Sequence, residues 1–385
     1  MIPPYVWEQM LRHGAPEQRA AAKKQLRLAE AVRLKRAMVF NHAFEELERT
    51  PGERTRKTYD AQGTENSPET VSRGEGDPET DQIEVNEAHD GAGWTWDLLK
   101  GRFNRDSLDD QGMVLVSIVD WDKMDNAFWD GVKMTYGRGQ IFNRFTADPT
   151  VNGHELGHGV IQFTAGLVYQ GEPGALNEHI ADVIGSMVEQ YALHQMTTDA
   201  DWLIGKELMT PTLNGRALRD MMNPGTAYVD DPLIGTDPQP AHYKDRYKGF
   251  SDNGGVHINS GIGNRAYAIA ATKLGGFVWE HVGRLWFDAL TDARISPTTT
   301  YSQFASLIRV ISREKYTTDI QDAVKFGWAN VGLDEETPAP PDNSPSDCPR
   351  EIREALARLS ASPDARKLIA WGRVIAARQN KEEDR

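Results

Sequence analysis

The segment His154-Glu155-Leu156-Gly157-His158 constrains this chain more than any other stretch of its 385 residues. On an α-helix, residues four apart lie on the same face, so both imidazoles can bind one ion while Glu155 lies beside them. Neutral imidazole nitrogen suits zinc, and a site with three protein ligands leaves a fourth position for water. Because two surface histidines can share a helical turn by chance, the pattern needs a third ligand before it indicates a metal site.

The position of the third ligand separates the classes of zinc peptidase. A metzincin has a glycine three residues after the second histidine and another histidine three residues later, but Ile161 and Thr164 stand at these places, which excludes that class. Glu178 follows His158 after nineteen intervening residues, so a second helix can bring its carboxylate to the metal. His154, His158 and Glu178 are therefore the candidate ligands of one zinc ion.

Two neighbours of Glu178 on the same predicted helix need separate interpretations. Asp182 lies one turn further on the same face, where its carboxylate can accept the other ring N–H of a ligand histidine and so orient the ring. His179 is a competing ligand, but it points about 100° away from Glu178 around the helix. We therefore expect Glu178 to bind the metal and Asp182 to hold a ligand histidine.

A second cluster, Asp252 to Gly261, places a histidine after paired glycines. Asp252 stands five residues before His257 and can orient its ring, which suits a group that stabilises an oxyanion or protonates a leaving amine. The alternative is a histidine in a turn that only bonds to the backbone.

Charge and hydropathy exclude some functions and suggest a location. The net charge of −14 argues against a general nucleic-acid binder, because phosphate contacts need clustered Lys and Arg. No apolar run approaches the roughly 18 residues that a membrane helix needs, and the start MIPPYVWEQMLRHG lacks the features of a secretory signal. The single cysteine, Cys348, suits a reducing compartment. We therefore expect a cytoplasmic protein, or one secreted by a non-classical route, without nucleic-acid or membrane partners.

The chain is uneven in charge and in pattern. Residues 1–50 carry nine Lys+Arg and six Asp+Glu, a net charge of +3, which leaves −17 for the rest, so this segment can dock onto an acidic body. Helical and β-like periodicities, with Gly/Pro-rich stretches between them, predict six further divisions. In chain order these are a long amphipathic helix (16–48), a linker or loose loops (50–81), β-rich structure (83–145), a mostly helical half (151–333), a Pro-rich linker (335–347) and a helical tail (352–379).

Three segments, HELGHGV, GALNEHIAD and DNGGVHINSGI, in this order and spacing, resemble the thermolysin-like metallopeptidase family. Further matches are Asn126-Ala127-Phe128-Trp129, Tyr169 in TAGLVYQ, Arg219 in ALRDMMNP and the run QDAVKFGWANVGL, so the resemblance covers roughly residues 80–333. The start IPPY and the later Tyr59-Asp60-Ala61 resemble the protealysin-like branch, whose members carry a short inhibitory propeptide.

The resemblance implies an α+β fold, a two-lobed zincin with a β-rich N-terminal lobe, a mainly helical C-terminal lobe and the active-site helix between them. The expected divisions are an inhibitory propeptide (1–55), the β-rich lobe with the zinc-motif helix (56–168), the helical lobe (169–334) and a linker with a helical tail (335–385).

The resemblance also assigns roles to particular residues. It implies one catalytic zinc ion, Glu155 as the base, Tyr169 and His257 as groups that stabilise the oxyanion, and Asp252 as the group that orients His257. It further implies that Asn126, the Ala127 carbonyl and Arg219 hold the substrate backbone, and that Val151 and Leu218 form walls of the pocket for the residue after the scissile bond.

Gly157 replaces the threonine that usually occupies this place in the family's zinc motif. With Gly153 and Gly159 it puts three glycines in one helix, each costing about 0.5–1 kcal/mol relative to alanine. We expect this helix to depend on tertiary packing and on the metal, and the glycines to permit close approach of backbones.

The double calcium site of the family is incomplete in this sequence. Glu189 and Asp201 remain, but Leu203 and Lys206 stand where carboxylates are expected, and Thr150 stands where an aspartate is expected. Calcium takes six to eight oxygen ligands, so tight calcium binding is doubtful.

The zinc motif predicts a zinc-dependent peptidase, and the resemblance implies a neutral endopeptidase that cuts peptides or proteins before bulky hydrophobic residues. It would be made as a zymogen that its own propeptide inhibits. One alternative is a zinc aminopeptidase, but that class spaces the glutamate one residue closer and has a Gly-x-Met-Glu-Asn motif, which this sequence lacks. The other alternative is an inactive zinc-binding interaction protein in which the helical tail is the working part.

Overall fold

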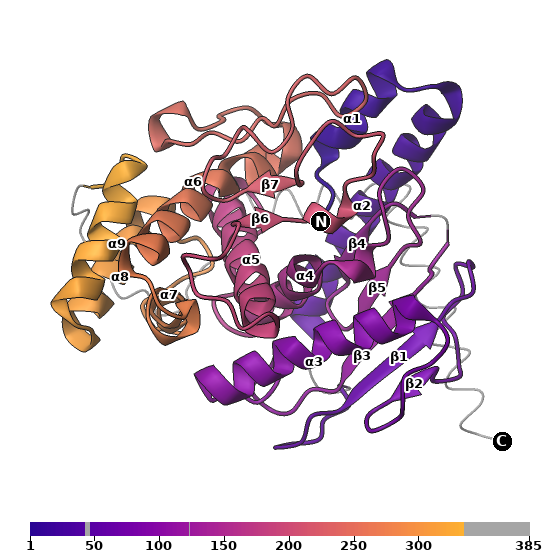
Figure 1. The fold of residues 1–385 in the computed structure, drawn as a ribbon, viewed down its shortest axis with the longest axis horizontal. Coiled ribbons are helices and arrows are strands. Elements are labelled where there is room, and N and C mark those ends of the chain that lie inside the picture. The colour runs from indigo at the N-terminus through magenta and orange to yellow at the C-terminus, as the bar shows by residue number, and fades with distance from the viewer. Residues whose placement is uncertain (43–46, 123, 335–385) are drawn as a thin grey trace. The chain divides into compact units, whose positions relative to one another are not determined.

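The computed structural model describes residues 1–42, 47–122 and 124–334. The expected Pro-rich linker, the helical tail and Cys348 lie outside the described residues. Figure 1 shows the arrangement expected from the sequence, a lobe that contains the sheet and a lobe of helices, so the two-lobed α+β fold is confirmed.

The N-terminal segment forms two consecutive helices. Helix α1 (Pro4–His13) starts with proline in its first turn and buries Val6, Trp7 and Met10 on one face. Helix α2 (Pro16–His42) follows after a two-residue turn and is the long helix expected from the sequence. Because Leu47 to Arg49 are not helical and Arg49 forms a β-bridge with Met113, the helix ends earlier than predicted.

The N-terminal lobe is built on a five-stranded sheet with the order β2-β1-β3-β5-β4. Parallel pairs join β1 to β3 and β3 to β5, while β2 and β4 pair antiparallel at the edges. Helix α3 (Ile83–Phe103) connects β2 to β3 and lies across the sheet in Figure 1. The strands are β1 (Arg56–Asp60), β2 (Arg73–Gly74), β3 (Leu115–Val119), β4 (Ala127–Trp129) and β5 (Met134–Tyr136).

The prediction of β-rich structure from 83 to 145 is wrong for its first 21 residues, which form α3. The segment contains Trp94, Trp96 and glycines, which have modest or poor helix propensity. Its buried residues nevertheless include Ala88, Ala92 and Leu99, which share one helical face. A Cβ on Gly91 would lie 2.5 Å from Asn152 Cγ, so this glycine permits close packing on the zinc-motif helix, which contains Asn152.

The prediction of loose loops from 50 to 81 is also wrong where β1 forms. This strand, Arg-Lys-Thr-Tyr-Asp, has no apolar alternation, yet Arg56 is only 8% exposed. Its guanidinium group pairs with Glu75 at 2.6 Å, which offsets the cost of burying the charge.

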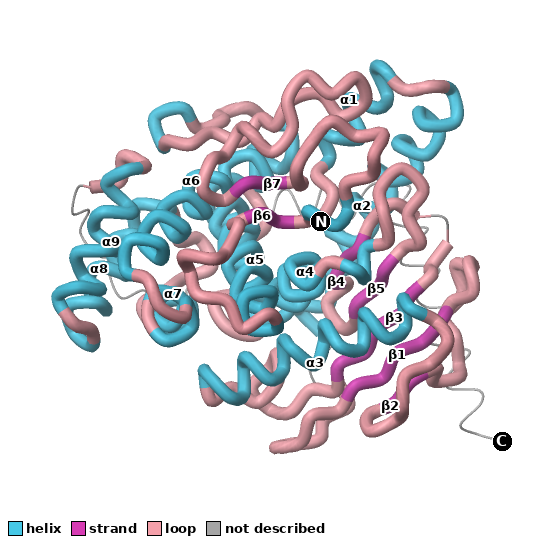
Figure 2. The backbone as a smooth tube through the Cα atoms, in the orientation of Figure 1, coloured by secondary structure: helices cyan, strands magenta, loops and turns pink. Residues whose placement is uncertain are grey.

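The chain from 149 to 330 follows the prediction of a mostly helical half. Its helices are α4 (Pro149–Gln162), α5 (Gly171–Ala192), α6 (Ser251–Leu274), α7 (Val282–Leu290), α8 (Tyr301–Lys315) and α9 (Thr318–Asn330). The segment between α5 and α6 is mostly loop in Figure 2 and carries β6 (Leu203–Ile204) and β7 (Arg219–Asp220). Short 3-10 turns are η1 (Phe145–Ala147), η2 (Lys206–Leu208), η3 (Tyr243–Asp245) and η4 (Val278–Glu280).

Helix α4 lies between α5 and β4 in Figure 1, so it connects the two lobes. It packs on α5 through small residues. A Cβ on Gly153 would lie 2.9 Å from Gly185 Cα, and a Cβ on Gly157 would lie 3.3 Å from Ala181 Cα. The glycines that weaken α4 as an isolated helix therefore let it approach α5 closely.

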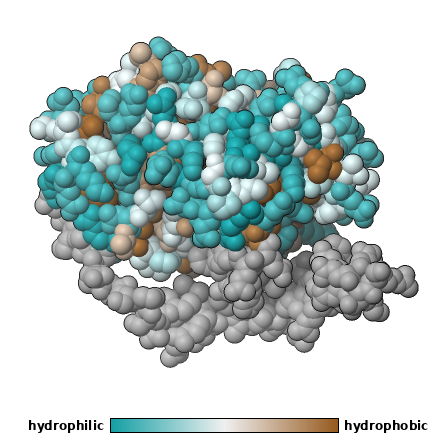
Figure 3. All heavy atoms as spheres, turned by 90° about the horizontal axis from the view of Figure 1, so that it is seen from below, coloured by the Kyte–Doolittle hydropathy of each residue, from teal (hydrophilic) through white to brown (hydrophobic). Residues whose placement is uncertain are grey.

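The part of the surface seen in Figure 3 is mainly hydrophilic, with small scattered apolar patches. Within the described ranges, no helix combines the length and apolar character needed to cross a membrane.

Candidate metal centre and active site

Three buried side chains from α4 and α5 converge on one point. Among the described residues, His154, His158 and Glu178 form one group whose ligand atoms all lie within 4.8 Å of one another. Glu178 Oε2 is 3.5 Å from His154 Nε2, and Glu178 Oε1 is 3.4 Å from His158 Nε2. Ligands of a tetrahedral zinc ion lie about 3.3 Å apart. His154 Nε2 and Glu178 Oε2 are buried without a hydrogen-bond partner, which fits a site for a metal ion.

The ring of His158 is oriented by Asn177, a residue that the sequence reasoning missed. Its Nδ1 lies 2.8 Å from Asn177 Oδ1, while Asn177 Nδ2 donates to the Leu167 carbonyl at 3.0 Å. A carbonyl only accepts, so the amide oxygen faces the histidine and the proton is on Nδ1, which leaves Nε2 for the metal. Burial lowers the pKa of His158 to about 3, which keeps the ring neutral. The only sequence signal was the position of an amide directly before Glu178.

The ring of His154 is oriented by Asp182, as expected. Its Nδ1 lies 2.7 Å from Asp182 Oδ1. Arg219 on β7 donates to both oxygens of this carboxylate, at 2.8 and 2.7 Å. Burial alone would raise the pKa of Asp182, but Arg219 and His154 outweigh it and hold the pKa well below its ordinary value. His179 faces another part of α6 and α7 and is not in the group of ligands.

Glu155 is buried beside the ligands, and both of its carboxylate oxygens have partners. Oε2 accepts from Trp129 N at 2.9 Å and from Arg36 Nη2 at 3.1 Å, while Oε1 lies 2.7 Å from the amino group of Met1. Burial alone would raise the pKa of Glu155, but these cations and the two histidines outweigh it and lower the pKa. The carboxylate is therefore ionised.

Tyr169, His257 and Asp252 form a second group beside Glu178. The Tyr169 hydroxyl donates to Glu178 Oε1 and lies 3.2 Å from His257 Nε2. His257 Nδ1 lies 2.6 Å from Asp252 Oδ1, and the other oxygen of Asp252 accepts from His257 N at 2.8 Å. Residues 252–255 have left-handed backbone angles, which fold Asp252 back onto the ring. Two donors thus face the same region as the metal ligands.

Electrostatics sets the charge of these two donors. Burial lowers the pKa of His257, but the carboxylates of Glu178 and Asp252 outweigh it and raise the pKa above its ordinary value. Burial and the charge of Glu178 raise the pKa of Tyr169 well above its ordinary value, so the phenol keeps its proton.

The first two residues of the chain lie against the groups expected to hold a substrate backbone. Ile2 N donates to Asn126 Oδ1 at 3.0 Å, and the amino group of Met1 lies 3.5 Å from the Ala127 carbonyl. Arg219 Nη1 donates to the Met1 carbonyl at 3.4 Å. The two expected pocket walls, Val151 and Leu218, are buried in the same core cluster as Met1.

Basic residues of α2 contact acidic and polar groups of both lobes. Lys24 pairs with Glu65 at 2.9 Å and with Asp122, and Lys35 pairs with Asp130 at 2.5 Å. On the helical lobe, Arg33 donates to Asn253, the neighbour of Asp252. The docking of a basic segment onto an acidic body, expected from the charges, is present in these contacts.

The region of the expected calcium ligands contains an ammonium group instead. Lys206 Nζ lies 2.9 Å from Glu189 Oε1 and 2.8 Å from Asp201 Oδ2. Burial raises the pKa of Glu189 to about 7 despite its bond to Lys206. Thr150 donates to Asp148 and accepts from Gly205 N, so its hydroxyl is engaged within the protein.

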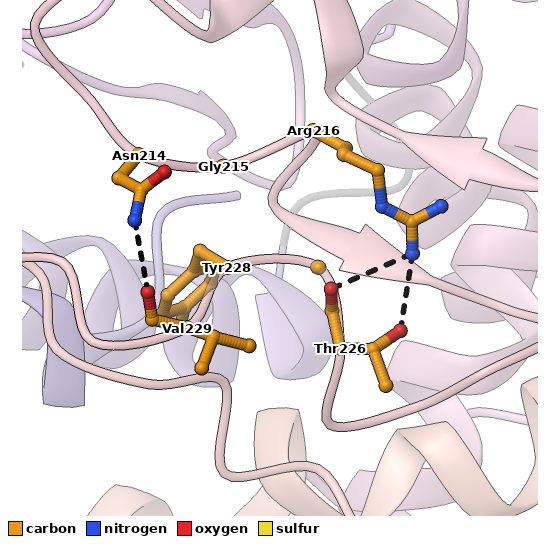
Figure 4. A pocket seen from close by; sticks show the side chains of 7 residues that line it. Asn214, Gly215, Arg216, Thr226, Tyr228 and Val229 are labelled. Carbon is orange, nitrogen blue, oxygen red and sulfur yellow. Dashed lines mark hydrogen bonds between the residues drawn. The ribbon is translucent and has the colours of Figure 1, made fainter.

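A cavity of about 250 Å³ lies in the loops between α5 and α6 (Figure 4). Figure 4 shows Asn214 bonded to the Val229 carbonyl and Arg216 bonded to Thr226 on its rim. None of the metal ligands or of the donors around them lines this cavity, so it is distinct from the metal centre.

Comparisons with known proteins agree with this geometry. The chain matches the model for the thermolysin metallopeptidase catalytic domain over residues 27–162 and that for the alpha-helical domain over residues 165–333. An extracellular metalloprotease of Pectobacterium carotovorum subsp. carotovorum is 41% identical over 339 residues, 87% of this chain and 96% of that protein. An extracellular minor metalloprotease of Serratia marcescens is 36% identical over 287 residues, 72% of this chain and 78% of that protein. The solved precursor of protealysin, a metalloproteinase from Serratia proteamaculans, has a TM-score of 0.78 at 41% identity and covers 86% of this chain and 99% of that one.

The names of these relatives contradict the cytoplasmic location expected from the sequence. Two of them are named extracellular metalloproteases. The expectation was based on the N-terminal residues and on a single cysteine, and neither prevents a protein from working outside the cell.

Proposed function

The chain belongs to the thermolysin family of zinc metallopeptidases, and on that premise we propose that it cleaves peptide bonds before bulky hydrophobic residues after release from an inhibitory N-terminal segment. The observation that carries this proposal is the convergence of His154, His158 and Glu178 next to the ionised Glu155. Membership of this family makes the chain a zinc metalloendopeptidase, so the aminopeptidase and inactive-protein alternatives are set aside.

The proposed chemistry divides among the residues around the metal ligands. A zinc ion bound here supplies Lewis acidity and a water molecule with a pKa near about 7. Glu155 would take the proton of that water and pass it to the leaving amine. Tyr169 and His257 would donate hydrogen bonds to the oxyanion, with Asp252 holding the ring of His257.

The contacts of the first two residues support the proposed substrate-binding groups. The backbone of Met1 and Ile2 bonds to Asn126, the Ala127 carbonyl and Arg219, as a substrate backbone would. The backbone of Met1 lies between the Ala127 carbonyl and Arg219, and its apolar side chain is only 7% exposed. This burial supports a preference for a hydrophobic residue after the scissile bond. We infer that Val151 and Leu218 are walls of this pocket.

We infer that residues 1–55 form the inhibitory propeptide, 56–168 the first catalytic lobe and 169–334 the second. The segment supports this division because Met1, Ile2 and α2 contact the active site, whereas β1, from Arg56, is an inner strand of the catalytic sheet. By analogy with the relatives named above, we propose that the enzyme acts outside the cell.

We also propose that this protein does not need calcium at Glu189 and Asp201. The ammonium group of Lys206 already lies within hydrogen-bond distance of both carboxylates. Too few free oxygen ligands remain there for calcium.

Two variants test the proposed assignment. Glu155→Gln should bind zinc as the wild type does but lose cleavage of an N-acetylated peptide with Leu or Phe after the scissile bond. His154→Ala should lose zinc. Full activity in Glu155→Gln would contradict the role of the base, and unchanged zinc content in His154→Ala would contradict the ligand set.

A further inference from the structure

A chain of hydrogen bonds connects the buried His179 to a proposed metal ligand. Its Nε2 accepts from Trp286 Nε1 at 2.8 Å, and its Nδ1 lies 2.9 Å from Asn264 Oδ1. Asn264 Nδ2 donates to Asp182 Oδ2 at 2.8 Å, and Asp182 Oδ1 lies 2.7 Å from His154 Nδ1. The chain runs from α7 through α5 and α6 to α4, which carries the metal ligand.

The chemistry of its ends determines the direction of each hydrogen bond. An indole N–H only donates, and an ionised carboxylate only accepts. Trp286 must therefore donate, so His179 carries its proton on Nδ1 and not on Nε2. That N–H requires the oxygen of Asn264, which turns the amide nitrogen toward Asp182. The carboxylate accepts there and can accept the Nδ1 proton of His154, which leaves His154 Nε2 free.

The fold provides a fitted space for the His179 ring. The side chain is fully buried, and a Cβ on Gly263 of α6 would lie 2.5 Å from its Cγ. The rings of Trp286 and Phe304 pack edge-on against it, with centroids 6.4 and 6.5 Å away. The imidazole therefore keeps one orientation, in which both nitrogens have partners.

We propose that His179 and Trp286 are positioning residues for the metal centre, which act through Asn264 on Asp182 and His154. This proposal rests on the proposed function, because it takes His154 to be a metal ligand. The indole N–H selects one tautomer of His179, and that tautomer holds the Asn264 amide with its nitrogen toward the carboxylate. Asp182 then keeps all its donors, from Arg219, Asn264 and His154, and holds the ligand ring in place.

The first test measures zinc affinity of the full-length protein after removal of metal with a chelator. His179→Leu removes both ring nitrogens and should raise the dissociation constant for zinc about tenfold, as the loss of an outer partner of a ligand does. His179→Gln, which can both accept from Trp286 and donate to Asn264, should restore most of the affinity. In a peptidase assay with zinc in excess, His179→Leu should lower kcat and leave KM unchanged.

Phe304→Leu is the matched control. It disturbs the same aromatic cluster without touching the hydrogen bonds, so it should lower the melting temperature but not the affinity for zinc. An equal loss of affinity in Phe304→Leu, or unchanged affinity in His179→Leu, would overturn the proposal.

Trp286→Phe gives a second test that keeps the aromatic packing and removes only the N–H. In protein labelled with ¹⁵N at histidine, His179 of the wild type should show a single tautomer protonated on Nδ1, and the variant should show a mixture. A single unchanged tautomer would contradict the inferred direction of the chain. His154→Ala separates the proposed ligand set from the proposed positioning role of His179 and Trp286. If it still binds zinc, the proposed ligand set fails; if it loses zinc while His179→Leu and Trp286→Phe behave as wild type, only the positioning role fails.

Discussion

Arg36 of helix α2 donates a hydrogen bond of 3.1 Å to Oε2 of Glu155. The Glu155 side chain is fully buried, whereas the Arg36 side chain is 22% exposed. The second carboxylate oxygen lies 2.7 Å from the amino group of Met1. Because both oxygens have cationic partners, we infer that Glu155 is a poor acceptor for the proton of a water molecule while the N-terminal segment is in place.

We predict that Arg36→Ala weakens this latency. A hydrogen bond between charged groups contributes about 1.5–3 kcal/mol, so its loss should raise the initial peptidase rate of the full-length chain by roughly tenfold or more. The rate is measured directly after zinc is added to metal-free protein, and intact mass shows that the chain is still uncut.

The control for this prediction is Arg27→Ala, which removes an exposed arginine from the same helix. It lowers the charge of the segment equally but should leave the initial rate within about twofold of the wild type, because exposed charges contribute little. Equal activation by both substitutions would assign the effect to net charge and not to the contact with Glu155.

The metal ligands were predictable because helical spacing dictates their geometry. His154 and His158 must share a face of any helix that contains them, and Glu178 and Asp182 follow from the same periodicity on a second helix. The roles of Tyr169 and Arg219 came from the resemblance alone. Spacing cannot show which residues of the connecting segments meet the metal ligands in space.

The parts that the sequence could not predict depend on tertiary contacts. Strand β1 is polar, and its Arg56 is buried with Glu75 and the His89 carbonyl as partners from elsewhere in the chain. Helix α3 contains glycines, and the reason for one of them is the close packing of Gly91 on Asn152 of α4, which the sequence alone does not show. The role of Asn177 depends on the Leu167 carbonyl, which accepts from its amide nitrogen and so turns the amide oxygen toward His158.

We predict that the effects of Gly→Ala substitutions depend on what the new Cβ meets. In α3, Gly101 is exposed and its Cβ would meet nothing nearer than 4.0 Å, so Gly101→Ala should stabilise the protein by about 0.5–1 kcal/mol. Gly157→Ala gains the same helix propensity but crowds Ala181 at 3.3 Å, so it should be near neutral. Gly153→Ala meets Gly185 Cα at 2.9 Å and should cost about 1–3 kcal/mol. Urea unfolding of the zinc-loaded protein measures the unfolding free energies of the three variants. Stabilisation by Gly153→Ala would contradict the close packing of α4 on α5.

We predict that acid weakens the fold partly through His89. This residue on α3 is 1% exposed, and its burial, together with Arg56 and Arg73, lowers its pKa to about 4. Below pH 6.5 the unfolded chain binds a proton that the folded chain does not, so stability is lost as the pH falls from about 6.5 to about 4. At pH 5 the loss from this group is roughly 2 kcal/mol. His89→Gln should reduce the difference in unfolding free energy between pH 7 and pH 5 by about that amount, and an unchanged difference would show that His89 is not the group responsible.

We predict that Lys206 makes a stabilising contribution that calcium makes in other members of the family. Lys206→Met leaves the carboxylates of Glu189 and Asp201 without their cation, and Glu189 is only 5% exposed, so the variant should lose about 1–3 kcal/mol at pH 8. Burial already raises the pKa of Glu189 to about 7, so the folded chain holds a proton more tightly than the unfolded chain, and this favourable effect is lost as the pH rises through 7. The defect of Lys206→Met should therefore be smaller at pH 6 than at pH 8.

The effect of calcium on stability tests whether Lys206 replaces the ion or merely contributes packing. The melting temperature of the wild type, measured by calorimetry with zinc in excess, should be the same with millimolar calcium as with a calcium chelator. Lys206→Asp places a third carboxylate beside Glu189 and Asp201, so it should be less stable than the wild type without calcium. It should recover with calcium, because hard oxygen ligands then surround the ion. If calcium raised the melting temperature of the wild type as much as that of Lys206→Asp, the ammonium group of Lys206 would not replace the ion.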